Sequence, residues 1–127
     1  MSTATSSGTT DLPPLDPEAL TRLERFGGAK LLHEMIALYL ESAPERLGAA
    51  EAGLAAGDPI ATENALHSLK SSSAQLGAAR LSRLCEEGEM IARSGTVAGI
   101  ASLIESSRDE LARVEAWLDE VRVARPR

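Results

Sequence analysis

Apolar residues recur at spacings of three and four along most of the chain, which is the period of an amphipathic helix. The segment from about Thr96 to Val123 shows the spacing most clearly, with apolar residues at Ile100, Leu103, Ile104, Leu111, Val114, Leu118 and Val121. No stretch alternates between apolar and polar residues with the period of two that a half-buried strand requires. The pattern therefore predicts an all-α protein.

Proline and glycine divide the first half of this pattern into separate predicted helices. Asp16-Pro17-Glu18 is typical of a helix start, and this first helix is short and ends at Gly27-Gly28. A second helix is predicted from about Ala29 to Ser42. Its expected apolar face consists of Leu31, Leu32, Met35, Leu38 and Tyr39. We expect a kink or a restart at Pro44, because proline cannot donate to the helical hydrogen-bond ladder.

The remaining segments predict further helices joined by short connections. One carries Leu47 and ends at Gly57, and the next begins at Asp58-Pro59 and ends near Gly77. Another carries Leu81 and Cys85 and closes at Ser94-Gly95 before the last helix begins. Short connections between helices favour antiparallel neighbours. We predict an antiparallel up-and-down four-helix bundle with an additional short N-terminal helix.

The start of the chain differs in composition from the rest. Residues 1–15 are rich in Ser, Thr and Pro and are predicted to form a disordered tail. The helical pattern then occupies residues 16–124, which we interpret as one bundle domain. Aromatic residues make up only 2% of the chain, so its core must consist of Leu, Ile, Val and Ala, which suit closely packed helices.

Charge and composition exclude several function classes. The net charge of −6 argues against binding to nucleic acid or to an anionic membrane surface. No apolar run approaches the roughly 20 residues of a membrane span, and the opening residues do not resemble a signal peptide. A single cysteine, Cys85, fits a reducing compartment and is expected in the core. We therefore expect a cytoplasmic protein, and a monomer, because no apolar stripe is left over.

The helix expected to follow Asp58-Pro59 presents a histidine on its outer face. With Leu69 at the centre of the buried stripe and about 100° per residue, His67 lies about 160° away. The buried stripe consists of Thr62, Ala65, Ser73 and Leu76 in addition to Leu69. Around His67 on the outer face lie Asn64, Ser71 and Ala74, with Lys70 at the border. Because these neighbours are mostly short, another protein could approach the imidazole ring closely.

The stretch His67-Ser68-Leu69-Lys70-Ser71-Ser72-Ser73 is followed by Leu76-Gly77-Ala78, Leu81, Leu84-Cys85 and Glu89. This order and spacing resemble the signature of histidine-containing phosphotransfer (HPt) domains, and the resemblance covers about residues 16–122. It implies a helical bundle that carries a phosphoryl group on one histidine, accepting it from a receiver-domain aspartate and passing it to another. By this resemblance His67 is the phosphoacceptor, and the chain is a carrier rather than an enzyme with its own turnover.

The resemblance also implies roles for other residues and partners. Lys70 would offset the phosphoryl charge, and Ser71, where the family usually has glycine, could donate to the phosphoryl oxygens or hinder docking. Glu89 would hold the ring nitrogen opposite the phosphorylated one, and Arg93 would meet the phosphoryl group. The expected partners are response-regulator receiver domains or a hybrid histidine kinase. No cofactor or metal site is expected on this chain, and Mg²⁺ would be bound by the receiver.

Plainer alternatives remain open from the residues alone. The chain could be a receiver-binding scaffold that carries no phosphate, or a generic helical interaction module. Glu89 and Arg93 could be ordinary surface charges, and His33 is expected to be a helix-surface histidine. Gly88 occupies a position where the family more often has a core-facing apolar residue, and we expect it to weaken its helix without affecting the chemistry.

Overall fold

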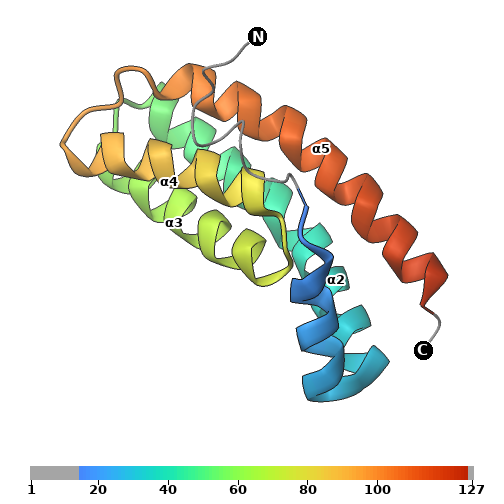
Figure 1. The fold of residues 1–127 in the computed structure, drawn as a ribbon. Coiled ribbons are helices and arrows are strands. Elements are labelled where there is room, and N and C mark those ends of the chain that lie inside the picture. Colours follow the sequence, from blue (N-terminus) through green and yellow to red (C-terminus); the bar gives the residue numbers. More distant parts are fainter. Residues whose placement is uncertain (1–14, 126–127) are drawn as a thin grey trace, which may run out of the picture.

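The computed structural model describes residues 15–125 and contains only helices among them. The four helices are α2 (Pro17–Ala55), α3 (Pro59–Gln75), α4 (Ala79–Arg93) and α5 (Ile100–Ala124), as Figure 1 shows. The predicted all-α class is therefore confirmed. The predicted disordered tail, residues 1–15, lies outside the described residues except for Leu15, which is partly buried.

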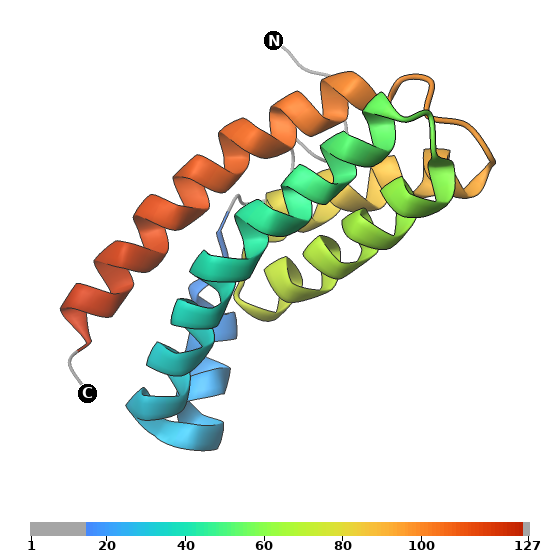
Figure 2. The same cartoon turned by 180° about the vertical axis from the view of Figure 1, so that it is seen from behind.

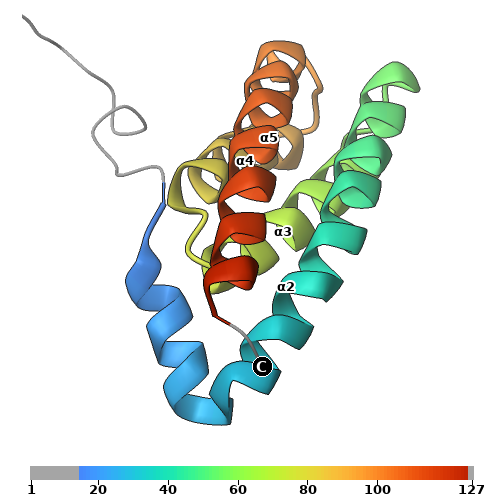
Figure 3. The same cartoon turned by 90° about the vertical axis from the view of Figure 1, so that its right-hand side faces the viewer.

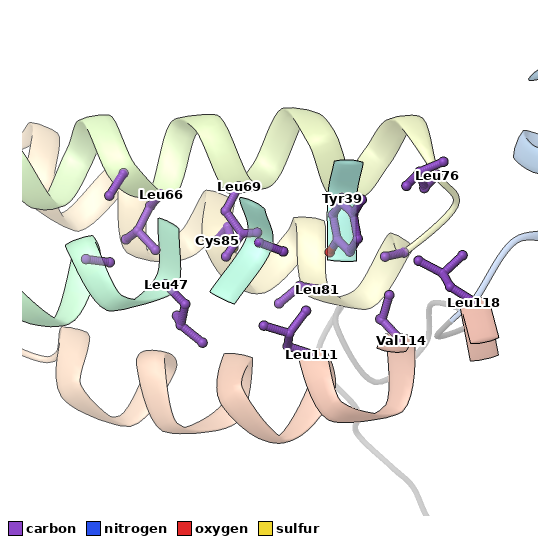
Figure 4. Close-up of a cluster of buried hydrophobic side chains, with 14 of the residues drawn as sticks. Tyr39, Leu47, Leu66, Leu69, Leu76, Leu81, Cys85, Leu111, Val114 and Leu118 are labelled. Atoms are coloured by element: carbon purple, nitrogen blue, oxygen red, sulfur yellow. The ribbon is translucent and has the colours of Figure 1, made fainter. Parts of the chain in front are cut away.

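The four helices form an up-and-down bundle. Each helix packs against the next one along the chain, and α5 also packs against α2, which closes the bundle (Figures 1 and 2). The core residues come from all four helices, and Figure 4 shows them pointing inward: Leu47 from α2; Leu66, Leu69 and Leu76 from α3; Leu81 and Cys85 from α4; Leu111, Val114 and Leu118 from α5. The predicted core of small and aliphatic side chains, Cys85 included, is confirmed.

A bend at Gly28 separates a short N-terminal helix from the rest of α2. The backbone leaves the helical conformation there, with φ +78° and ψ −178°, which glycine adopts without the steric penalty of a side chain. Asp16 caps the start of the short helix by accepting a hydrogen bond from the Glu18 N–H at 3.1 Å. Figure 3 shows the chain reversing direction at this bend. The predicted short helix ending at Gly27-Gly28 is confirmed.

The predicted restart at Pro44 is wrong, because α2 continues through this residue to Ala55. Pro44 is exposed, so the Leu40 carbonyl that loses its intrahelical partner lies on the water side of the helix. The neighbouring Ala43 and Leu47 are buried in the core. Tertiary packing of this face outweighs the local preference of proline.

The buried face of α2 differs from the predicted one at Leu38 and His33, and it also includes Ile36, which is fully buried. Leu38, predicted to face the core, is 59% exposed, whereas Tyr39 is buried and shares a 2.8 Å hydrogen bond with Ser73 of α3. His33, predicted on the surface, is buried, and its Nε2 contacts the backbone carbonyl of Arg125. The burial of His33 follows from the path of the chain at the end of α5, where Arg125 contacts its ring, whereas Leu38 lies beside α3 in an open groove.

Two glycines of α2 should respond oppositely to alanine. Gly28→Ala should lower the free energy of unfolding by about 1–3 kcal/mol, because a side chain disfavours the combination of positive φ and extended ψ that Gly28 adopts. Gly48→Ala should raise it by about 0.5–1 kcal/mol, because Gly48 is helical and a Cβ there meets nothing within 4 Å. Urea unfolding of both variants measures the contrast. Equal effects of the two substitutions would show that the Gly28 bend is not populated.

Candidate functional site

His67 stands on the outer face of α3 with its side chain 59% exposed. The predicted register of this helix is confirmed, since all five residues of its predicted buried stripe are buried: Thr62, Ala65, Leu69, Ser73 and Leu76. Leu66 is buried as well. It lies about 60° from Leu69 around the helix axis, so the sequence pattern could have included it in the buried stripe. The short neighbours Asn64, Ser71 and Ala74 are exposed, so the ring is open to approach.

A buried carboxylate from the adjacent helix holds the ring. Glu89 of α4 has a side chain that is only 2% exposed, and its Oε2 lies 2.7 Å from His67 Nδ1. A carboxylate removed from water in this way requires charged or hydrogen-bonding partners. The sequence alternative that Glu89 is an ordinary surface charge is therefore wrong.

Two cations, Lys70 and Arg93, complete the surroundings of Glu89. The Lys70 ammonium lies 2.8 Å from Oε1, and Arg93 Nη2 donates to Oε2 at 2.7 Å. Burial alone would raise the pKa of Glu89, but the hydrogen bonds from Lys70 and His67 outweigh it and hold the pKa below its ordinary value. Glu89 is therefore ionised at neutral pH and acts only as a hydrogen-bond acceptor.

This arrangement fixes the tautomer of the neutral imidazole. Because the Glu89 carboxylate can only accept, His67 Nδ1 must carry the proton that it donates. The other ring nitrogen, Nε2, keeps its lone pair and has no hydrogen-bond partner in the described part of the chain. The site thus presents a single unprotonated nitrogen to solvent, which is the requirement for a histidine nucleophile.

Arg93 is shared between two carboxylates rather than left available. Its Nε donates to Glu63 of α3 at 3.0 Å, and its Nη2 donates to Glu89. These carboxylates raise the pKa of Arg93, the hydrogen bond that it donates to Glu63 having the largest effect. Sequence reasoning missed Glu63, although it lies four residues before His67 and hence on the same helical face.

A groove of about 670 Å³ lies beside His67 between α2 and α3. The helix α3 and its C-cap Leu76 form one wall, with His67, Ser68, Ser71, Ser72, Ala74 and Gln75 from the helix itself. The helix α2 contributes Met35, Leu38, Tyr39, Ser42 and Arg46. Of the predicted docking residues, Ser71 and Ala74 line the groove and Asn64 does not. The exposed Leu38 gives its wall an apolar side chain that the sequence pattern had placed in the core.

The other chemistry-bearing residues do not join this site. His33 is buried against the C-terminal end of α5 and does not line the groove. Burial raises the pKa of the Cys85 thiol to about 12, so it remains protonated and is not a nucleophile. Within residues 15–125 no cluster of His, Cys, Asp and Glu could hold a metal ion. No helix in that part of the chain is both long and apolar enough to span a membrane.

Comparison with known proteins gives consistent matches. A family model described as the Hpt domain matches residues 34–122. The chain is 31% identical in sequence to histidine-containing phosphotransfer protein B (HptB) from Pseudomonas aeruginosa PAO1. Its structure superposes on the crystal structure of that protein with a TM-score of 0.84, and the match covers 91% of this chain and 98% of that one. The Hpt domain of a sensor hybrid histidine kinase from Shewanella is 26% identical, with a TM-score of 0.72 over 85% of this chain and 92% of that one. A search of curated proteins gave no match.

The ionised state of Glu89 predicts a pH-dependent contribution to stability. A carboxylate whose pKa is lowered on folding contributes stability above the ordinary carboxyl pKa of about 4.3, and loses it as the pH falls through the lowered value. Glu89→Gln should therefore lower the free energy of unfolding by about 1–3 kcal/mol at pH 7, and by progressively less in acid. Urea unfolding of wild type and variant from pH 7 to about pH 3 measures the difference.

Glu86→Gln is the matched control on the same helix. Glu86 is 45% exposed and lies 3.6 Å from Arg83, so its removal should change stability little at any pH. If Glu89→Gln changed the free energy of unfolding equally at every pH, Glu89 would not be an ionised carboxylate paired with cations.

Proposed function

The chain belongs to the histidine-containing phosphotransfer (Hpt) domain family, and we propose that His67 is the residue on which it carries a phosphoryl group. It is a histidine phosphocarrier of a phosphorelay. The observation that carries the assignment to His67 is the exposed ring whose Nδ1 is held by the buried Glu89 carboxylate. His33, the other histidine, is buried, and within residues 15–125 its ring contacts a backbone carbonyl rather than a carboxylate.

We propose the following transfer step. The Nε2 lone pair attacks the phosphorus of an aspartyl phosphate on a receiver domain, an N–P bond forms, and the bond from phosphorus to the aspartyl oxygen breaks. The aspartate leaves as a carboxylate, and the imidazole becomes a cation with its proton still on Nδ1. Glu89 stabilises this cation at 2.7 Å, and it does not need to take the proton. Transfer onward reverses the step with the aspartate of a second receiver as nucleophile.

The residues around His67 support this step in different ways. We propose that Lys70 keeps Glu89 ionised and offsets phosphoryl charge with its remaining N–H groups, since an ammonium has three donors. Arg93 fixes Glu89 from the other side through its bond to Glu63, which favours a structural role over contact with the phosphoryl group. Ser71, one turn from His67, has a hydroxyl free to donate to phosphoryl oxygens, and Asn64 and Ala74 keep the approach open.

The partner is proposed to be a receiver domain that docks over the groove beside His67. Met35 and Leu38 offer apolar contact there, and Arg46 offers a positive charge to an acidic partner. We propose that the Mg²⁺ used in the transfer is bound by the receiver, and that this chain has no turnover of its own because phosphoryl transfer needs mainly positioning and charge stabilisation. We further propose a monomer acting in the cytoplasm, where a lone cysteine stays reduced.

His67→Gln should abolish phosphoryl acquisition while leaving the fold intact. The experiment incubates the chain with a radiolabelled phosphorylated receiver domain of a hybrid histidine kinase and looks for an acid-labile, base-stable adduct. Because Glu89 retains Lys70 and Arg93, the variant should lose only about 1 kcal/mol of stability. His33→Gln is the matched control and should keep the adduct.

The alternatives make different predictions in the same assay. Receiver binding without any adduct in wild type would favour the scaffold interpretation and overturn the carrier assignment. An adduct that persists in His67→Gln and disappears in His33→Gln would move the phosphoacceptor to the other histidine.

Leu38→Asp should weaken receiver binding about tenfold with little effect on stability, because the side chain is exposed beside His67. Calorimetric titration with the receiver domain measures the affinity. Val123→Asp is the control, since this aliphatic residue is 81% exposed at the end of α5 and outside the groove. Equal losses in both variants would show that the groove is not the docking surface.

A further inference from the structure

The residues that immediately precede His67 and Glu89 contact each other where α3 and α4 meet. Leu66 is 2% exposed, and Gly88 opposite it is also buried. A Cβ placed on Gly88 would lie 2.7 Å from Leu66 Cδ1. Carbon atoms in ordinary contact are about 3.5–4.0 Å apart, so any side chain at residue 88 would require a displacement of about 1 Å.

Backbone conformation does not explain this glycine. Gly88 lies in the interior of α4 and is absent from the glycines with positive φ among residues 15–125. Glycine is a poor helix former, so its presence here is unfavourable for α4 considered alone. Gly48 in α2 is different, because a Cβ there would meet nothing within 4 Å. Close approach to Leu66 is therefore the feature that distinguishes Gly88.

The displacement would act directly on the pair that orients the histidine. The His67 Nδ1–Glu89 Oε2 distance is 2.7 Å, and N–H···O bonds weaken beyond about 3.2 Å. Leu66 Cδ1 is the end of a flexible side chain, but Leu66 is only 2% exposed and belongs to the packed core, so a new Cβ would displace either this side chain against its core neighbours or α3 relative to α4. A shift of about 1 Å between these segments is enough to break the bond from Glu89 to the ring.

We propose that Gly88 is a positioning residue for phosphotransfer: its missing side chain lets α4 approach α3 closely enough for Glu89 to hold His67 Nδ1. The inference rests on the proposed function of His67 for its kinetic consequence, whereas its geometric consequence stands by itself. It replaces the sequence expectation that Gly88 affects stability only.

The test compares wild type, Gly88→Ala and Gly48→Ala in the full chain. Nitrogen-15 NMR of the neutral His67 ring reports which nitrogen carries the proton, a signature that a loss of stability alone does not move. In Gly88→Ala the proton should shift from Nδ1 towards Nε2, and the rate of phosphoryl acquisition from a phosphorylated receiver should fall about tenfold, as for a misplaced orienting group. Gly48→Ala should change neither.

A second substitution separates close packing from other effects. Leu66→Val removes the Cδ atoms that the new Cβ would meet, so the double variant Leu66→Val/Gly88→Ala should recover both the Nδ1–H tautomer and the rate. This double variant also provides the comparison if Gly88→Ala alone fails to fold.

The outcomes that overturn the proposal are distinct from those that overturn the proposed function. A wild-type tautomer and rate in Gly88→Ala, or a double variant that recovers neither, would show that Gly88 does not position Glu89. If wild type acquires no phosphoryl group, the carrier function fails, and the ring nitrogen signals alone still decide the role of Gly88.

Discussion

The site depends on one carboxylate that is buried and surrounded by hydrogen-bond donors, two of them cations. Glu89 lies beneath His67 and accepts from His67, Lys70 and Arg93, so its negative charge is balanced where water cannot solvate it. Removal of any one donor would leave the other two to compensate, whereas removal of the carboxylate would release all three. The orientation of the ring, the choice of reactive nitrogen and the attachment of α4 to α3 near the site all follow from this single group.

Periodicity predicted most of the fold because each helix buries one continuous face. The register of α3, and hence the exposure of His67, followed from placing Leu69 at the centre of the stripe. The break at Gly28 was predictable because glycine permits positive φ. Pro44 was misjudged because local propensity does not include the packing of Ala43 and Leu47, which keeps the helix continuous.

The parts of the site that sequence missed are those formed between helices. Helix geometry alone could have placed Glu63 on the face of His67, but only packing brings Arg93 of α4 to it. Whether Glu89 is buried depends on how α4 packs against α3, where Gly88 lies against Leu66. Leu38 was assigned to the core because the periodicity of α2 alone cannot show which of its apolar side chains the other helices leave exposed. These features depend on contacts with a neighbouring helix, and the residue pattern of one helix carries no information about those contacts.

The ion pairs of this network differ in their access to water. Arg93 and Glu63 lie near the surface, where dissolved salt screens charges over a Debye length of about 8 Å at physiological ionic strength. Lys70 and Glu89 are largely shielded from it. Ionic strength would therefore change how quickly a charged partner finds this face, while the angle at which the imidazole is presented stays the same.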